Sequence, residues 1–155
     1  MNYIQKLVLV GNGMAGIRTL EHLLKIAPGA YEITVFGAEP HPNYNRIMLS
    51  SVLAGGAGLQ DIIINDWSWY EENNIRLYTD DPVTAIDTEN RQVTSRSGVC
   101  VSYDLLLLAT GSKAFILPLP GADKDGVIGF RDIRDCETMI ETAKTHKKAA
   151  VIGGG

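Results

Sequence analysis

The sequence predicts an α/β fold in which a parallel sheet carries an inserted three-stranded β-meander. Two short apolar runs, at residues 7–10 and 105–109, have the continuous hydrophobicity of strands that are buried on both faces of a parallel sheet. Residues 83–102 instead hold short strands separated by the turn residues Glu89-Asn90 and Ser97-Gly98, a pattern typical of antiparallel strands. These two patterns together define the fold class.

The first 36 residues predict a βαβ unit. The strand at residues 7–10 runs directly into a cluster of glycines. Apolar residues then recur at helical spacing, at Met14, Ile17, Leu20 and Leu24. Pro28-Gly29 ends this helix, and residues 33–36 form the second strand. Two strands joined through a helix in this way are expected to be parallel.

The elements that follow are shorter. We expect a short helix at 47–54 within an irregular segment rich in proline and glycine, a helical turn at 67–73 and a strand at 75–78. The meander strands are expected at 83–87, 92–95 and 99–102, and the strand at 105–109 returns to the parallel sheet. After residue 112 the expected elements are a helix with one apolar face, formed by Ile133, Cys136, Ile140 and Ala143, and a strand at 149–152.

Composition and charge exclude several classes of protein. The 155 residues contain 18 acidic and 14 basic side chains, for a formal net charge of -4, which argues against nucleic-acid and anionic-membrane partners. No apolar run approaches the roughly 18 residues that span a bilayer, and the N-terminus lacks the pattern of a signal peptide. Cys100 and Cys136 form neither a CxxC pair nor a metal site. We therefore expect a cytoplasmic protein without structural disulfides.

The glycine cluster carries the strongest chemical signal. The segment from Gly11 to Gly16 reads G-N-G-M-A-G and fits G-x-G-x-x-G between a strand and a helix. Its glycines permit a tight turn, close approach of a pyrophosphate and packing of helix on strand, and the helix N-terminus favours phosphate. Glu39 lies just beyond the second strand, where an acid can accept hydrogen bonds from ribose hydroxyls. This order predicts a Rossmann-like dinucleotide-binding unit.

Five segments, in their order along the chain, resemble a known family. They are VLVGNGMAG, EPHPNYNRIMLS, DPVTAID, YDLLLLATGS and VIGGG. They are similar to FAD-dependent pyridine-nucleotide oxidoreductases with two dinucleotide-binding domains, and YNRIMLSSVLAGG most resembles the N-terminal flavin module of the large subunits of NAD(P)H-dependent nitrite reductases. The resemblance covers essentially the whole chain and implies a truncated form of that two-domain flavoprotein fold.

The resemblance also implies a domain organisation. Residues 1–112 would be the first part of the FAD-binding domain, residues 113–131 a linker, and residues 132–155 the truncated start of the NAD(P)H-binding domain. A second glycine motif would begin at Gly153, Gly154 and Gly155. We interpret the chain as a piece of a longer polypeptide, and we do not expect this piece to be catalytically competent by itself.

The cofactor-binding residues follow from the resemblance position by position. The FAD pyrophosphate would be held by Gly11, Gly13, Met14, Ala15 and Gly16, and the adenosine ribose by Glu39. Arg46 would lie near the flavin-side phosphate and ribityl chain, Val83 would offer backbone groups to the adenine, and Arg131 would lie near the flavin. The loop that passes the cofactor would be formed by Ala109, Thr110 and Gly111. Ser51 belongs to the same set, in a position where ferredoxin and rubredoxin reductases often carry a lysine, so that a flavin-side cation is missing or comes from elsewhere.

The intact enzyme, by this resemblance, would take hydride from NAD(P)H onto FAD and pass single electrons to a metal centre. In a nitrite reductase of nitrate assimilation, this centre would be an iron–sulfur cluster with sirohaem that reduces nitrite to ammonia, with ligands outside this chain. A small subunit or an electron-acceptor protein is the expected partner. Two alternatives stay open: a rubredoxin- or ferredoxin-type NAD(P)H reductase, and a non-catalytic module that binds NAD or AMP.

The remaining reactive and aromatic side chains have ordinary interpretations. Cys100 and Cys136 are too far apart in the sequence for a redox dithiol, and Cys136 is predicted to be a core residue. The histidines lack metal-ligand spacing, although His41 beside the Arg46 segment keeps the alternative of lining the site. The cluster of Trp67, Trp69 and Tyr70 is predicted to be a packing cluster rather than a stacking platform. The chain is therefore predicted to contain neither catalytic residues nor metal ligands.

Overall fold

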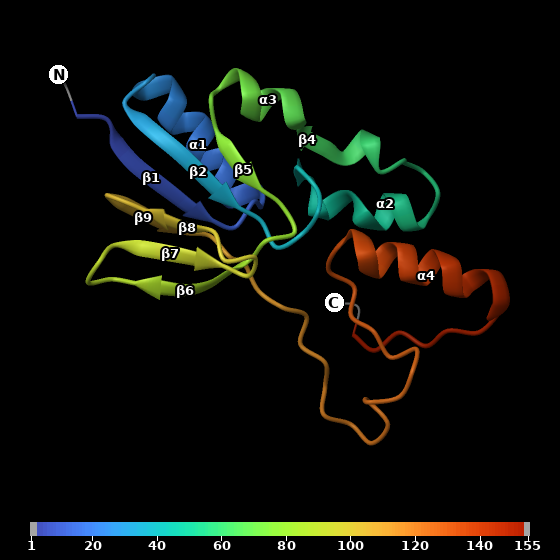
Figure 1. Ribbon diagram of the computed structural model, residues 1–155. Coiled ribbons are helices and arrows are strands. Elements are labelled where there is room, and N and C mark those ends of the chain that lie inside the picture. The colour runs from blue at the N-terminus through green and yellow to red at the C-terminus, as the bar shows by residue number, and fades with distance from the viewer. Residues whose placement is uncertain (1–2, 154–155) are drawn as a thin grey trace. The chain divides into compact units, whose positions relative to one another are not determined.

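The computed structural model describes residues 3–153, which divide into two compact units (Figure 1). The first unit contains residues 3–45 and 63–111, and the second contains residues 46–62 and 112–153. In the described part of the chain, no helix is both long enough and apolar enough to cross a membrane.

The first unit is built on a parallel sheet with the strand order β5-β2-β1-β9. Its strands are β1 (Gln5–Val10), β2 (Tyr31–Phe36), β5 (Arg76–Tyr78) and β9 (Leu105–Leu108). All three pairings are parallel, and helix α1 (Met14–Ile26) connects β1 to β2. The predicted βαβ unit and the parallel sheet are therefore confirmed.

Alternate residues of the central strands enter two separate cores, one on each face of the sheet. Leu7 and Leu9 of β1 pack with Ile17 of α1 and with Tyr70 on one face. Val8 and Val10 pack on the other face with a cluster that includes Val93 of the meander. Burial on both faces explains why residues 7–10 are continuously apolar in the sequence. The same prediction for residues 105–109 is wrong, because β9 is an end strand of the described sheet and Leu105 and Leu108 remain exposed.

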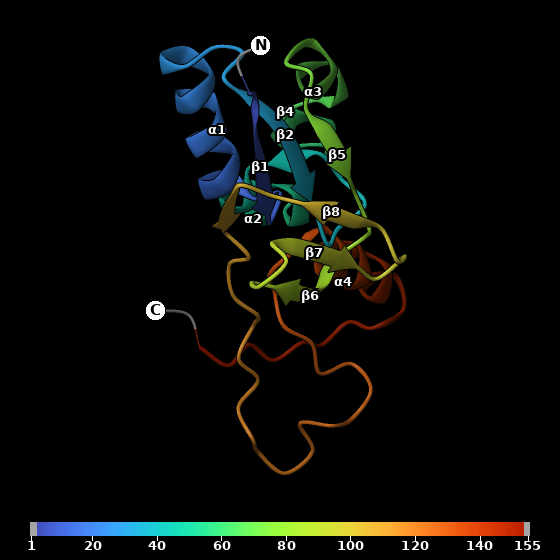
Figure 2. The same ribbon diagram turned by 60° about the vertical axis from the view of Figure 1, so that its left-hand side comes forward.

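The meander consists of β6 (Val83–Asp87), β7 (Gln92–Ser95) and β8 (Cys100–Ser102), paired antiparallel in the order β6-β7-β8 as predicted (Figure 2). The chain returns from β8 to the parallel sheet through Asp104. The Asp104 carboxylate accepts a hydrogen bond of 2.7 Å from the Lys6 backbone N–H, and the Asp104 N–H donates one of 2.8 Å to the Lys6 carbonyl. Paired backbone and side-chain bonds thus fix the return point.

Two elements of the first unit were not predicted. Strands β3 (Asn43–Tyr44) and β4 (Ile63–Asn65) form a small antiparallel sheet, joined by a hydrogen bond of 2.8 Å from Asn43 Nδ2 to Asn65 Oδ1. Such short strands give too few residues for a periodic pattern in the sequence. Helix α3 (Trp67–Glu72) confirms the helical turn predicted at 67–73, and its N-cap is Asp66, whose side chain accepts a hydrogen bond from the Trp69 N–H.

The regular secondary structure described in the second unit is helical, with long irregular segments at 112–131 and 146–153. Its helices are the 3₁₀ turns η1 (Arg46–Met48) and η2 (Gln60–Ile62), and the α-helices α2 (Leu49–Leu53) and α4 (Ile133–Thr145). Asp132 and Asp135 form a capping box at the start of α4. Cys136 is fully buried beside the Leu49 carbonyl, which confirms its predicted core position.

The strand predicted at residues 149–152 is wrong for this structure. These residues are exposed and have no regular secondary structure, and Val151 retains 87% of its surface. A strand requires a neighbour to satisfy its backbone groups, and no described strand pairs with these residues. Gly153 adopts a positive φ of 89°, whereas Gly154 and Gly155 of the predicted second motif lie outside the described residues.

Candidate dinucleotide-binding site

The glycine loop crosses the carboxyl edge of the parallel sheet, between β1 and α1. Gly11 has a φ of +114°, and its N–H donates a hydrogen bond of 2.8 Å to the Phe36 carbonyl. A Cβ atom on Gly11 would lie only 2.2 Å from the Ala109 carbonyl oxygen. The conformation and the close approach of a second loop therefore both require glycine at this position.

The other two glycines of the motif have different surroundings. Gly16 is buried, and a Cβ there would lie 2.9 Å from the Gly11 carbonyl oxygen and 3.1 Å from the Ala109 Cβ. Gly13 has open space: apart from Gly13 and its two chain neighbours, no described residue has an atom within 4 Å of an added Cβ. The absence of side chains at Gly11 and Gly16 thus lets the loop and the helix pack closely, while Gly13 leaves room for a ligand to approach the backbone.

The N-terminus of α1 suits an anion. Gly13 is the N-cap, no side chain among the described residues caps the helix, and Met14 and Ala15 belong to a first turn without acidic residues. In contrast, Asp66 and Asp132 cap α3 and α4. The first N–H groups of a 13-residue helix carry partial positive charge, so this end fits a pyrophosphate group.

A polar side-chain network that the sequence did not reveal supports the glycine loop. Asn12 accepts a hydrogen bond of 2.7 Å from the Tyr70 hydroxyl and donates one of 3.2 Å to the His41 carbonyl. The Tyr70 hydroxyl also accepts a bond of 3.2 Å from the Asn43 N–H. Burial raises the pKa of Tyr70 to about 12, so it remains a protonated donor at neutral pH.

Glu39 lies beyond the end of β2, beside the glycine loop. Because β1 and β2 pair in parallel, with Val10 opposite Phe36, both loops leave the same edge of the sheet. The half-buried Glu39 side chain accepts a hydrogen bond of 2.7 Å from the hydroxyl of Tyr44, a buried residue of β3. Tyr44 therefore orients an acid at the place where the sequence predicted a ribose ligand.

The loop after β9 reaches the same edge. Leu108 is opposite Val10 in the sheet, so Ala109, Thr110 and Gly111 emerge next to the glycine loop. The Ala109 N–H donates a hydrogen bond of 2.8 Å to the Val10 carbonyl. The structure thus brings together three sets of predicted residues in this unit: the glycine motif, Glu39, and residues 109–111.

Val83 is the first residue of β6 and lies opposite Ser95 of β7. It follows the short connection from β5, the strand that flanks β2 in the parallel sheet. The preceding residues Asp80 and Asp81 make backbone hydrogen bonds to the loop that carries Glu39. Val83 therefore begins the meander only two residues after Asp81, which is hydrogen-bonded to the loop that carries Glu39.

The remaining predicted residues belong to the second unit, where Arg46 and Arg131 are neighbours. Arg46 Nη1 donates a hydrogen bond of 3.0 Å to the Arg131 carbonyl. Arg131 Nε donates one of 3.1 Å to the Ser112 carbonyl, and the Arg131 N–H donates one of 2.7 Å to the Asp135 carboxylate. Ser51 lies exposed on α2. Two of the three predicted flavin-side residues are thus in direct contact.

The structure also places the other reactive and aromatic residues. Cys100 is exposed, Cys136 is buried, and both are free. Among residues 3–153, no cluster of histidine, cysteine, aspartate and glutamate could hold a metal ion. Tyr70 is buried in the core that includes Leu7 and Leu9, and Trp69 packs against this core, as predicted. Trp67, in contrast, is 49% exposed. Of the three residues of the predicted packing cluster, Trp67 is the most exposed.

Comparison with known proteins identifies related chains. The sequence profile of the pyridine nucleotide-disulphide oxidoreductase family matches residues 5–155. A nitrite reductase [NAD(P)H] of Bacillus subtilis (strain 168) is 60% identical over 97% of this chain and 19% of its own length. The assimilatory nitrate reductase electron transfer subunit of the same organism is 55% identical over 97% of this chain and 20% of its own length.

A solved structure has the same fold. The crystal structure of NADH:rubredoxin oxidoreductase from Clostridium acetobutylicum superposes with a TM-score of 0.85 and 33% identity, over 97% of this chain and 39% of that one. The chain spans about a fifth of the length of the two Bacillus relatives. Because the family profile covers nearly all of its residues, the chain belongs to the pyridine nucleotide-disulphide oxidoreductase family.

Proposed function

We propose that this chain is the FAD-binding part of an NAD(P)H-dependent oxidoreductase that delivers electrons to a metal centre for the reduction of nitrite to ammonia. The observation that carries the proposal is the edge of the parallel sheet where the uncapped N-terminus of α1 meets the loops after β2 and β9. Ligands of open α/β sheets bind at the carboxyl ends of the strands.

The residues of this edge suit the two halves of an adenosine diphosphate group. The space at Gly13 and the N–H groups of α1 fit a pyrophosphate. The Glu39 carboxylate, held by Tyr44, is a hydrogen-bond acceptor for ribose hydroxyls. Its negative charge also disfavours a 2′-phosphate at the same place, so FAD fits this site better than a 2′-phosphorylated dinucleotide.

Arg46 and Arg131 are the residues proposed for the flavin side. The Arg46 guanidinium donates a hydrogen bond to the Arg131 carbonyl, so the two arginines are neighbours in the second unit. Arginine is suited to phosphate recognition because its planar donors match phosphate oxygens. When bound, FAD supplies the redox chemistry that exchanges a hydride for single electrons. The role of the chain is to bind and orient it.

Nitrite is the proposed substrate because of the relatives. The relative named as a nitrite reductase is 60% identical to this chain, whereas an NADH-rubredoxin oxidoreductase is 32% identical. A metal centre that reduces nitrite, with sirohaem and an iron–sulfur cluster, would lie outside this chain. The second candidate is a reductase of a rubredoxin- or ferredoxin-type acceptor, which the superposition on the Clostridium acetobutylicum enzyme favours.

Titration of the purified chain with FAD tests cofactor binding. We expect saturable binding that shifts the visible flavin absorption, and weaker binding for both Glu39→Ala and Arg46→Ala. Unchanged titration curves for these variants would refute the two residue assignments. The acceptor is tested in the full-length protein that contains this chain. Nitrite-dependent NADH oxidation with formation of ammonia supports the first candidate, and reduction of rubredoxin without nitrite turnover supports the second.

A further inference from the structure

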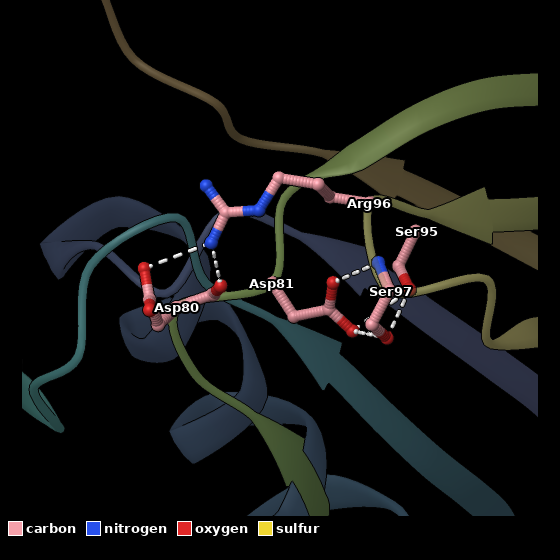
Figure 3. A network of polar contacts seen from close by, with 5 residues as sticks. All are labelled: Asp80, Asp81, Ser95, Arg96 and Ser97. Carbon is pink, nitrogen blue, oxygen red and sulfur yellow. Dashed lines mark hydrogen bonds and ion pairs between the residues drawn. The ribbon is translucent and has the colours of Figure 1, made fainter.

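Asp81 lies in the connection between β5 and β6 and is almost completely buried, with 7% of its surface exposed. Its carboxylate accepts hydrogen bonds from the hydroxyls of Ser95, at 2.7 Å, and Ser97, at 2.6 Å. A third bond of 2.8 Å comes from the Ser97 backbone N–H (Figure 3). One carboxylate therefore ties the β5–β6 connection to the turn that follows β7.

The backbone of the same connection is tied to the loop after β2. The Asp81 N–H donates a hydrogen bond of 3.0 Å to the Gly37 carbonyl, and the Asp80 N–H donates one of 3.0 Å to the Glu39 carbonyl. Arg96 strengthens the link from the meander side. Its N–H donates to the Pro82 carbonyl at 2.9 Å, and its guanidinium contacts the carbonyl and carboxylate of Asp80. Residues 80–82 thus bridge the Glu39 loop and the meander.

We propose that Asp81 is a positioning residue for the adenosine end of the cofactor site, because it holds the segment before Val83 against the loop that carries Glu39. This inference rests on the proposed function, in which Glu39 binds the ribose and Val83 lies at the adenine. Asp81 itself touches neither group of the cofactor. Its effect on ribose recognition passes through the backbone bonds to the loop that carries Glu39.

A negative charge suits this bridge better than a neutral amide. All three groups that face the carboxylate donate hydrogen bonds to it, and bonds to an ionised acceptor are the stronger kind. The Ser97 hydroxyl, followed by that of Ser95, holds the pKa of Asp81 below its ordinary value, so the group is ionised at neutral pH. In Asp81→Asn, one acceptor oxygen becomes an amide donor that faces two hydroxyls.

The experiment measures how strongly the chain distinguishes ADP from 2′,3′-dideoxy-ADP, which lacks the ribose hydroxyls. Dissociation constants for both nucleotides are obtained by calorimetric titration. Wild-type chain should prefer ADP, and Glu39→Ala should abolish this preference. We expect Asp81→Asn to reduce the preference about fivefold, as expected when hydrogen bonds to a charged group are weakened. Ser97→Ala, which keeps the backbone bond to Asp81, should reduce it less.

Asp87→Asn is the matched control. The Asp87 carboxylate also accepts bonds from a turn of the meander, from the N–H groups of Glu89 and Asn90, but the structure shows no bond from it to the Glu39 loop within residues 3–153. It should retain the wild-type preference. Thermal unfolding of each variant establishes that it is folded at the titration temperature. If Asp81→Asn is unfolded at that temperature, Ser97→Ala tests the proposal.

The possible outcomes distinguish a failure of the Asp81 role from a failure of the proposed function. A wild-type preference in both Asp81→Asn and Ser97→Ala overturns the positioning of Glu39 by Asp81. If the wild-type chain binds ADP without preferring the ribose hydroxyls, the Glu39 assignment fails and the positioning role fails with it. If the chain binds neither FAD nor ADP, the proposed function fails.

Discussion

The Tyr70 hydroxyl donates a hydrogen bond of 2.7 Å to the side chain of Asn12, 58 positions earlier in the chain. Asn12 is the residue between the first two glycines of the motif, and Tyr70 is a buried residue of α3. A helix remote in sequence therefore holds the loop that is proposed to cradle a pyrophosphate.

Removing this hydroxyl should weaken cofactor binding. Tyr70→Phe keeps the ring in the core but leaves Asn12 without its donor. We expect a loss of about 1 kcal/mol in unfolding free energy and weaker binding of FAD in the titration described above. Tyr3→Phe is the control, because the exposed Tyr3 hydroxyl bonds to Asp104 near the start of β1, away from the glycine loop. Equal effects of the two substitutions on FAD binding would contradict the assignment.

The glycines of the motif should respond differently to alanine. Gly11→Ala places a methyl group against the Ala109 carbonyl and imposes a positive φ on alanine, so we expect a loss of about 3 kcal/mol or more in stability. Gly13→Ala meets no described atom and should change stability by no more than about 1 kcal/mol. Its added methyl group should nevertheless reduce FAD affinity about tenfold or more, through steric exclusion of the phosphate. Thermal unfolding and FAD titration measure the two effects, and a stable Gly11→Ala variant would show that the loop packs differently.

Acid should destabilise the fold through Asp81. Its pKa is lowered in the folded state by the hydroxyls of Ser97 and Ser95, so its contribution to stability is present above the pKa of the unfolded chain. That contribution is lost as the pH falls through the lower folded value. Unfolding midpoints between pH 7 and pH 3 should therefore fall less steeply in Asp81→Asn than in wild type. The exposed Asp123→Asn serves as a charge-matched control, and identical acid profiles for all three proteins would exclude this role of Asp81.

The helix of the second unit should depend on its capping box. Asp132 accepts a hydrogen bond of 2.9 Å from the Asp135 N–H, and Asp135 in turn holds the Arg131 N–H. We expect Asp132→Ala to cost about 1 kcal/mol, visible as a lower thermal midpoint by circular dichroism. Asp125→Ala, an exposed substitution in the connecting segment, should leave the midpoint near that of wild type. A midpoint unchanged by Asp132→Ala would mean that α4 does not need this cap.

The periodic parts of the fold could be predicted from the sequence, because each is encoded locally. Residues 7–10 are apolar without interruption, and residues 33–36 are apolar apart from the buried Thr34, because both strands are covered on both faces. The spacing from Met14 to Leu24 gives the helix between them. The glycine motif and Glu39 could be found for the same reason, since their positions relative to the strands place them at one edge of the sheet.

The supporting contacts could not be predicted, because they join residues far apart in the chain. Nothing in the sequence around Asn12 points to Tyr70, and nothing around Asp81 points to Ser95 and Ser97. The small β3–β4 sheet depends on a pairing of two asparagines that are 22 positions apart. The strand predicted at 149–152 failed for the opposite reason, since local apolar character cannot make a strand without a neighbour.

The two aspartates at the ends of the meander also bear on how the first unit unfolds. Asp81 fastens the chain where it enters the meander, and Asp104 fastens it where it leaves. A sheet of three strands needs an apolar face to be stable, and the buried Val93 of the meander packs in one core with Val8 and Val10 of the parallel sheet. We therefore expect no state in which the meander melts alone: amide protons of β7 and of β1 should exchange with solvent through the same cooperative opening.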